Sequence, residues 1–498
     1  MTAIALAGVA GGGPLAWASG AMAADLPSGP YGGAPAEQAV RACSEHGGGF
    51  FAIPGSDTCL RIGGMVEANA TMTTPQERGA SSRYGVIVTG RIDADARTST
   101  DWGALRTFVR FDISSLTGTG VSGDKARLGS GFGATGVDTW GKAQKGVDVS
   151  RAFIQFGGLT AGRASSFFEF YAHDVEMLGA TPASDASPVN LLAWTFGLSK
   201  GWSLTLSAED GIWRRRPVAW SGAVHADGSW SPDGWTPGAT PVALVPLGAG
   251  PDGRPIFGRV DVRQRDTMPD VVAALRLDRS WGALQFSGAL RRLDVRGTVR
   301  DGNGAIVAGH GPAGKYGGAV QAGVMLNLPA LGDGDRLWLQ AAWGRGALSY
   351  TGAAPLGFDT LNGNQFGKIT AWSADALVGP DGQLRLSRSW SAVAALQHYW
   401  RPDFAQSVFA GYGRVSYGRG LTAGMGTAGG FAGPIPGNGV LAVGTRLDWE
   451  PVKDLFVSGE VAWTRLRNSR PAVEASRVAW TPRQENGWNA RLQIQRSF

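Results

Sequence analysis

Strict alternation of apolar and polar residues over Val86–Ile113 constrains the fold of this chain more than any other feature. From Val86 to Thr98, one set of alternate positions holds only apolar or small residues, Val86, Val88, Gly90, Ile92, Ala94, Ala96 and Thr98. The other set carries Arg91, Asp93, Asp95 and Arg97. Because successive side chains of a strand point to opposite faces, this segment predicts a strand with one apolar face and one charged face.

The alternation resumes after a tight turn at residues 99–103. Apolar residues recur from Leu105 to Phe111, with Arg106 and Arg110 between them and Phe108 as the one exception. Each strand is about ten or more residues long, which suits a tilted membrane-spanning strand better than a strand of a soluble sheet. The hairpin is therefore expected to face lipid on one side and water on the other, as in a transmembrane β-barrel.

The connections between predicted strands alternate in length. Short turns such as residues 278–282 and 401–403 alternate with long loops such as 169–190 and 210–269. Short turns at one end and long loops at the other are typical of outer-membrane barrels. Tryptophans beside the short turns indicate an aromatic girdle at a membrane interface, Trp102, Trp202, Trp281, Trp400 and Trp449. These patterns predict an all-β antiparallel barrel of about sixteen strands over residues 60–498.

Composition and motifs disfavour other classes of protein. Arginines are scattered along alternating strands beside acidic residues rather than gathered in a basic stripe, so no nucleic acid is expected as a partner. No HExxH pair or GxSxG elbow occurs, and Gly309–Lys315 has P-loop spacing but is followed by Tyr316 instead of Ser or Thr. We therefore expect no enzymatic activity, catalytic residue, cofactor or metal site.

The first residues have the character of an export signal. Residues 1–23 are uncharged and largely apolar, and they end in Ala21-Met22-Ala23, which predicts a signal peptide cleaved after Ala23. Residues 24–59 are predicted to be a periplasmic lead-in. Its cysteines, Cys43 and Cys59, are expected to form one disulfide in an oxidising periplasm, and two free thiols are the alternative.

Several segments together resemble the porins of alphaproteobacteria, the general diffusion porins of rhizobial and Brucella-type outer membranes. The resemblance is carried by Cys43–Arg61 (CSEHGGGFFAIPGSDTCLR), Arg151–Phe168, Asn190–Gly211, Pro269–Leu290, Ala319–Leu339, Ser389–Tyr399, Glu450–Asp454 and Trp488–Phe498 (WNARLQIQRSF). It implies a homotrimeric, sixteen-stranded porin in the lipid of the outer membrane, with its third long loop folded into the lumen. It also implies that the barrel-assembly machinery reads the last strand and its terminal Phe498.

Candidate pore residues follow from the barrel pattern. Folded inward, the constriction loop near residues 169–190 would bring Asp174 and Glu176 towards the wall. Six arginines on the lumen side of strands are the candidates for an opposing basic face, Arg91, Arg97, Arg106, Arg110, Arg151 and Arg163. Opposed charges would order water across the passage. The alternative is that these arginines pair with Asp93, Asp95 or Asp112 and only keep the wall soluble.

Three functions remain open at this point. The first is a diffusion porin that passes small hydrophilic solutes and ions. The second is a solute-selective channel of the outer membrane, whose lining would include a track of aromatic residues. The third is a structural or adhesive surface barrel with a closed lumen, whose function resides in its loops. Conductance separates the first from the third, and competition between solutes separates the first from the second.

Overall fold

The computed structural model describes residues 41–74, 84–118, 144–186, 188–216, 218–220, 223–224, 230–231, 242–249, 251, 255–300, 306–310, 314–353, 358–359, 363–364, 374–378, 383–418, 422–424, 432–434, 437–469 and 484–498. The predicted signal peptide (residues 1–23) and residues 24–40 of the predicted lead-in lie outside the described residues. Among the described residues, no helix is long and apolar enough to cross a membrane.

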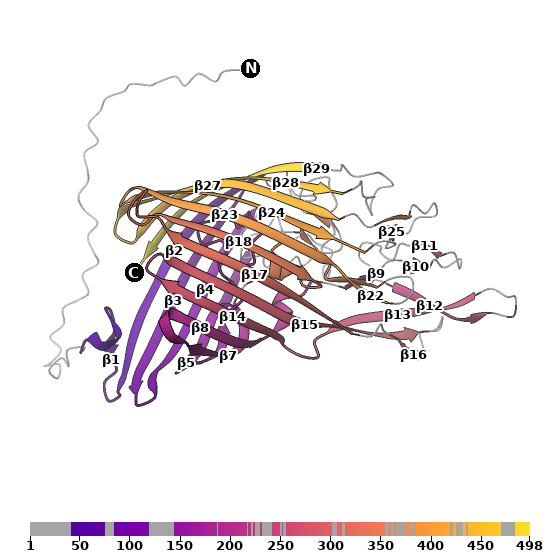
Figure 1. Ribbon diagram of the computed structural model, residues 1–498, viewed down its shortest axis with the longest axis horizontal. Helices are drawn as coiled ribbons and strands as arrows, with labels where there is room; N and C mark the ends of the chain where they lie inside the picture. The colour runs from indigo at the N-terminus through magenta and orange to yellow at the C-terminus, as the bar shows by residue number, and fades with distance from the viewer. Residues whose placement is uncertain are drawn as a thin grey trace, which may run out of the picture. The chain divides into compact units, whose positions relative to one another are not determined.

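Sixteen strands of the described chain form the wall of a closed antiparallel barrel (Figure 1), which confirms the predicted fold class. They are β2 (Thr58–Thr74), β3 (Tyr84–Thr100), β4 (Gly103–Gly118), β5 (Gln144–Phe156), β6 (Leu159–Ala164), β7 (Val189–Gly197), β8 (Trp202–Glu209), β14 (Asp270–Arg279), β15 (Gly282–Arg300), β17 (Lys315–Asn327), β18 (Arg336–Arg345), β23 (Arg388–Arg401), β24 (Phe404–Ser416), β27 (Asn438–Val452), β28 (Leu455–Asn468) and β29 (Gln484–Ser497).

The wall closes between its first and last strands. Strand β29 pairs with β2 over ten residues, from Met65 opposite Ser497 to Thr74 opposite Trp488. The amide and carbonyl of Phe498 continue this pairing with Gly64, at N–O distances of 3.1 Å in both directions. Because consecutive strands are antiparallel, the short connections gather at the end of the barrel that holds Phe498, and the long loops lie at the opposite end.

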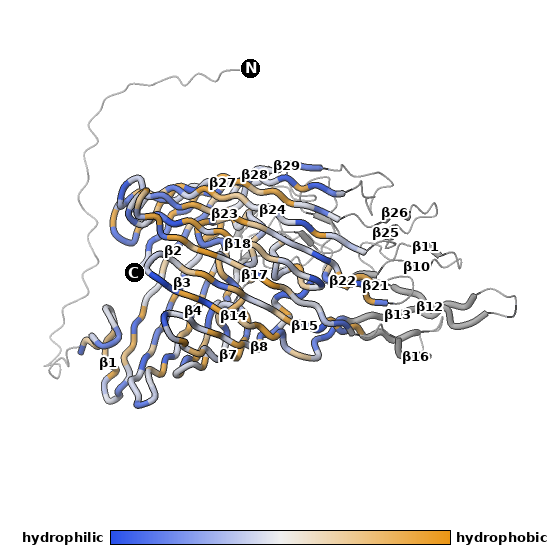
Figure 2. Tube along the Cα trace, in the orientation of Figure 1, coloured by the Kyte–Doolittle hydropathy of each residue, from blue (hydrophilic) through white to orange (hydrophobic). Residues whose placement is uncertain are grey.

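Side chains alternate across the wall as predicted. On β3, Val88 and Ile92 are 43% and 53% exposed, whereas Thr89 and Asp95 on the other parity are buried. Figure 2 shows this alternation as successive apolar and polar segments along the strands. Exposed apolar residues around a closed sheet are expected where lipid replaces water, because the backbone is already paired within the sheet. The predicted girdle residues Trp102 and Trp400 are 81% and 60% exposed beside short turns.

The strand bounds differ from the prediction in several places, and two of these differences change which residues belong to the wall. The predicted strand from Leu159 to Phe168 ends at Ala164, since Phe167 and Phe168 leave the wall and pack inside the barrel. The long segment 210–269, expected to be irregular, contains β12 (Val242–Ala249) and β13 (Pro255–Arg265). These strands extend the sheet beyond the barrel by pairing along the far end of β15, with β16 (Ile306–His310) on its other side.

The described part of the lead-in is held against the start of β2. Cys43 and Cys59 form the predicted disulfide. The short β1 (Phe51–Ala52) pairs with β2, and Phe50 is buried beside the disulfide. The guanidinium groups of Arg61 and Arg97 lie 5.0 and 4.7 Å from the Phe50 ring centre, so the lead-in contacts the lumen face of the wall.

Candidate pore constriction

One long connection folds into the barrel. We call residues 165–188 (187 is not described), between β6 and β7, the inner loop. Three glutamines on neighbouring strands form hydrogen bonds with the backbone of its first half. Gln285 donates to the Glu169 carbonyl at 2.9 Å, and Gln321 donates to the Phe168 carbonyl at 2.8 Å. Gln340 accepts from the Tyr171 amide at 2.9 Å. These glutamines belong to β15, β17 and β18, so the loop leaves β6 and runs along the far wall.

The tip of the inner loop reaches the last two strands of the barrel. Glu460 on β28 accepts hydrogen bonds from the Met177 and Leu178 amides, the latter at 3.0 Å. Arg491 on β29 donates to the Met177 carbonyl at 2.7 Å. Glu460 thus binds two amides of the tip and Arg491 binds one of its carbonyls, so the loop is fixed at its far end as well as at its start.

Glycines on the wall make room for the apolar side of the loop. A Cβ atom at Gly323 would lie 2.2 Å from the Phe170 ring, and one at Gly411 would lie 2.7 Å from the Pro182 ring. Inward side chains of β18, β23 and β24 bury the loop's apolar residues, including Tyr171. Backbone hydrogen bonds and close packing thus place the loop against one side of the lumen.

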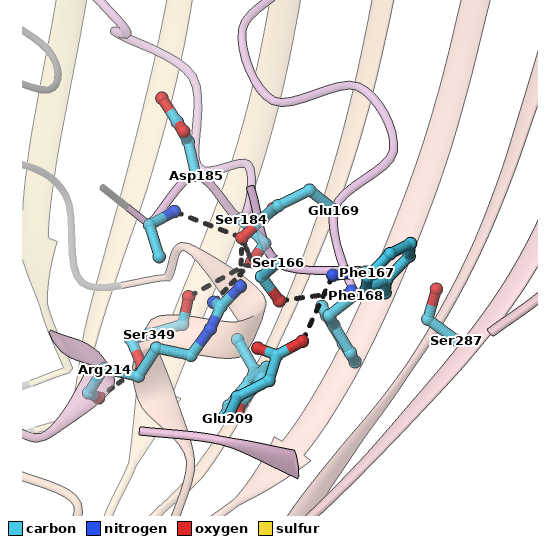
Figure 3. A network of polar contacts seen from close by, with 12 residues as sticks. Ser166, Phe167, Phe168, Glu169, Ser184, Asp185, Glu209, Arg214, Ser287 and Ser349 are labelled. Atoms are coloured by element: carbon cyan, nitrogen blue, oxygen red, sulfur yellow. Dashed lines mark hydrogen bonds and ion pairs between the residues drawn. The ribbon is translucent and has the colours of Figure 1, made fainter. Parts of the chain in front are cut away.

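Arg214 clamps the two ends of the inner loop together (Figure 3). It lies in the 3-10 helix η4 (Gly211–Arg214) after β8 and is fully buried. One terminal nitrogen donates to the Ser184 hydroxyl at 3.1 Å, and the other forms an ion pair with Glu169. Burial lowers the pKa of Arg214, but the carboxylate of Glu169 outweighs burial and raises it above its ordinary value. The guanidinium therefore stays charged.

A second buried ion pair supports the clamp. Arg291 on β15 donates to the Asp375 carboxylate (3.0 Å) and to the Arg214 carbonyl (3.2 Å). Asp375 also accepts from the Leu348 amide at 2.8 Å. Loops that follow β6, β8 and β18 are thereby joined. The sequence analysis did not single out Arg214 or Arg291, because a buried arginine in a long loop has no local pattern.

The structure places Glu176 inside the loop, away from the open lumen. Its carboxylate accepts from the Tyr171 hydroxyl at 2.8 Å and from the Thr181 amide at 3.0 Å. His173 lies beside it, with Nδ1 3.3 Å from Asp185 and Nε2 2.8 Å from the Thr181 carbonyl. Burial lowers the pKa of His173, but Glu176 and Asp185 outweigh burial and raise the pKa to about 9. Glu176 thus has a structural role in the loop.

Asp174 is the exposed carboxylate of the loop. Partial burial raises its pKa, and the positive charges of Arg336 on β18 and Arg446 on β27 act in the opposite direction. The arginines that act on Asp174 are therefore on the wall behind the loop, and they are not members of the predicted basic face.

Four predicted arginines form ion pairs along the opposite wall. We call Arg91, Arg97, Arg106, Arg110, Arg151 and Arg163 the arginine face. Within it, Arg91 pairs with Asp112 (2.7 Å), Arg97 and Arg106 share Asp95 (2.9 and 3.0 Å), and Arg110 pairs with Asp93. The inward Phe108 is covered by Arg106 and Arg110, which explains the one exception in the alternation.

The other two members have different contacts. Arg151 donates to the Ser165 hydroxyl at 3.0 Å, and Arg163 donates to the Val149 carbonyl at 2.8 Å and lies 4.2 Å from the Trp213 ring centre. A cavity of about 500 Å³ borders Arg91 and Arg110 and extends to Gly49 of the lead-in. The arginine face therefore lines a cavity large enough for water molecules. Most of its positive charge is balanced by neighbouring aspartates.

A closed antiparallel barrel with an apolar outer face, a charged inner face and a loop bound inside defines a transmembrane barrel of the porin type. A porin subfamily model matches residues 34–490, so this chain belongs to that porin subfamily, as the sequence resemblance predicted.

Individual relatives agree with this assignment. The chain is 30% identical over 203 residues to porin Omp2b of Brucella canis, covering 40% of this chain and 51% of that protein. It is 28% identical over 279 residues to porin Omp2b of Brucella suis, covering 54% and 61%. The chain thus spans about half the length of the first curated relatives it matches. The outer membrane channel DcaP of Acinetobacter baumannii has a similar fold, with a TM-score of 0.50, 11% identity and coverage of 89% and 97%.

Proposed function

We propose that this chain forms a water-filled channel through which small hydrophilic solutes and ions diffuse passively across the outer membrane. The observation that carries the proposal is the inner loop, which is bound at its stem by Arg214 and at its tip by Glu460 and Arg491. A loop fixed in this way narrows a lumen without moving, and a charged, hydrated wall on the other side favours polar solutes.

The arginine face is proposed to form one side of the narrowest passage and the inner loop the other. Its ion pairs join the facing strands β3 and β4, where Arg91 is opposite Asp112 and Asp93 is opposite Arg110. Such pairs offer hydrogen-bond donors and acceptors to a passing solute, which suits broad passage of hydrophilic molecules. Asp174 is proposed to contribute charge from the loop side.

The direct test is reconstitution of the purified chain into a planar bilayer. A diffusion channel gives stepwise, stable conductance in simple salt, and millimolar sugars or amino acids do not block it. Strong block by one solute would instead indicate the solute-selective alternative. The absence of conductance steps would favour a surface barrel with a closed lumen.

We also propose a homotrimer, on the basis of the porin family. Sedimentation of the detergent-solubilised protein, combined with mild cross-linking, would measure the number of chains. Assembly is proposed to depend on Phe498, a residue that is 72% exposed while its backbone pairs with Gly64. An exposed aromatic side chain beside the seam between β2 and β29 supports this proposal.

A further inference from the structure

Two arginines face each other on the outside of the barrel near the long-loop end. Arg345 on β18 is directly opposite Arg388 on β23, and both side chains are exposed on the outward parity of their strands. Neither has an ion pair or side-chain hydrogen bond among the described residues. Like charges directly opposite each other on a sheet repel, so this pair is unfavourable unless an anion bridges it.

A third arginine lies one strand further on. Arg414 on β24 is opposite Trp390, the residue two positions after Arg388, and it is exposed on the same outer face. Three guanidinium groups therefore point away from the barrel within a patch of three strands. Guanidinium groups match phosphate oxygens in geometry as well as charge.

Aromatic residues form the next row towards the middle of the membrane. Trp343 and Trp390 are directly opposite each other, 49% and 42% exposed, and each is two residues from its arginine. The Tyr412 ring centre lies 5.3 Å from that of Trp390. Tryptophan and tyrosine prefer the level of lipid head groups, which places Arg345 and Arg388 at the level of the phosphates and Arg414 beside Trp390 in the aromatic row.

Below the aromatic row the outer wall is hollowed. The floor of this groove consists of alanines on four neighbouring strands, Ala322, Ala341, Ala392, Ala394 and Ala410. Larger side chains surround the alanines, Phe286, Leu339, Tyr412 and Leu441. The groove has a volume of about 660 Å³. Along each strand, two residues correspond to about 6.7 Å, so the groove begins roughly 13 Å below the arginines.

We propose that this outer surface binds a phosphorylated lipid of the outer leaflet, with its phosphates on Arg345, Arg388 and Arg414 and an acyl chain in the alanine groove. The order of arginines, aromatic rings and apolar groove matches the order of phosphate, interface and acyl chain in such a lipid. A second copy of this chain would cover the groove with apolar residues but would leave the paired guanidinium groups without an anion. The occupant favoured by charge is therefore a lipid.

The test measures lipid binding by the full chain in a zwitterionic detergent, using native mass spectrometry. The probes are lipid A carrying its phosphates, the same lipid A after removal of the phosphates, and inorganic pyrophosphate. The charge variant is Arg345→Gln with Arg388→Gln. Its matched control is Arg401→Gln, at the other end of the same strand β23, where the arginine pairs with Asp403 at 2.9 Å.

We expect the native chain to bind phosphorylated lipid A at least about tenfold more tightly than the dephosphorylated form, which corresponds to about 1.4 kcal/mol. The charge variant should lose this preference and Arg401→Gln should keep it. Ala392→Phe, which fills the groove, should weaken binding of both lipids. Pyrophosphate should compete only at far higher concentration than the lipid.

Equal binding of the two lipids, or an unchanged preference in the charge variant, would overturn the proposal. It would also be overturned if Ala392→Phe left lipid binding intact but changed the number of chains in the particle, since that result identifies a contact between copies. Conductance measured on the same variants keeps this test separate from the proposed channel function, because Arg345, Arg388 and Ala392 face outward.

Discussion

Arg214 is the residue on which the position of the inner loop depends most directly. Its two terminal nitrogens contact the outgoing and the returning arm of the loop, at Glu169 and Ser184. A buried charge is stable only while its partner is present, so removal of either partner leaves an uncompensated ion inside the protein.

Replacement of Arg214 by Met is therefore expected to lower the free energy of unfolding by about 3–5 kcal/mol. Equilibrium unfolding in detergent measures this loss, and limited proteolysis reports release of the loop. The control is Arg215→Met, because Arg215 pairs with Asp266 at a partly exposed site and should contribute no more than about 1 kcal/mol. Equal losses in the two variants would contradict the clamp.

The pH dependence of the inner loop should follow His173. Its pKa is raised to about 9 in the folded protein, above the ordinary value of 6.5. A raised pKa stabilises the folded loop fully below pH 6.5, and this stabilisation is lost as pH rises through about 9. Hydrogen exchange of the loop amides should therefore increase between pH 7 and 10 beyond the intrinsic rate. His173→Gln should remove the excess, and an identical profile in that variant would contradict the assignment.

Among the structural elements, the inner loop packs closely on the wall because the wall has glycines at the points of contact. Gly411 on β24 lies under Pro182, and a Cβ there would come within 2.7 Å of the proline ring. A rigid ring cannot rotate away, so a larger residue must push the loop towards the arginine face.

Gly411→Leu is thus expected to reduce single-channel conductance and to cost about 1–3 kcal/mol of stability by overpacking. The adjacent Ala410→Leu adds the same side chain on the outer face, and it should leave conductance unchanged. The same effect of both substitutions on conductance would contradict the close packing of Pro182 on Gly411.

The seam between β2 and β29 depends on Gly64. A Cβ at this residue would lie 2.4 Å from the Arg91 carbonyl oxygen and 2.7 Å from the Phe498 ring. Gly64→Val should therefore impair closure of the barrel, while Gly90→Val on β3, where nothing lies within 4 Å of the added Cβ, should fold normally. The shift in gel mobility between heated and unheated samples measures closure. Normal closure of Gly64→Val would contradict this view of the seam.

The strands were predictable because each of them carries its own pattern. The alternation of apolar and polar residues predicts that Ile92 and Asp95 lie on opposite faces of β3, and this prediction requires no knowledge of the partner strand. The end of β15 was missed: the apolar alternation predicted a strand from Ala283 to Leu293, whereas β15 continues to Arg300 because its last residues pair with β13. The loop contacts were also missed. Glu176 and Asp174 are two residues apart in the sequence, but only the fold decides that one is buried and the other exposed.

At the scale of the whole molecule, the barrel separates two environments and the loop divides the interior. The described inner-loop contacts lie mainly on strands after β8, whereas β3 and β4 carry the ion-paired part of the arginine face. Solutes are therefore expected to pass between these two surfaces.

Neutralising part of the arginine face should change ion preference in a defined direction. Replacement of Arg91 and Arg106 by Gln removes the guanidinium groups that balance Asp112 and share Asp95, so the wall becomes more negative. The reversal potential in a salt gradient should shift towards cation preference. As a control, Arg401→Gln removes an exposed arginine that pairs with Asp403 at the short-turn end of β23, and it should shift the reversal potential less.

Single-channel recording of the native chain in a planar bilayer shows whether the barrel holds an open passage beside the inner loop. We expect uniform, stable conductance steps in simple salt, with the reversal potential shifting towards cation preference in the Arg91→Gln, Arg106→Gln variant. A correctly folded barrel that inserts into the bilayer without giving conductance steps would contradict this expectation.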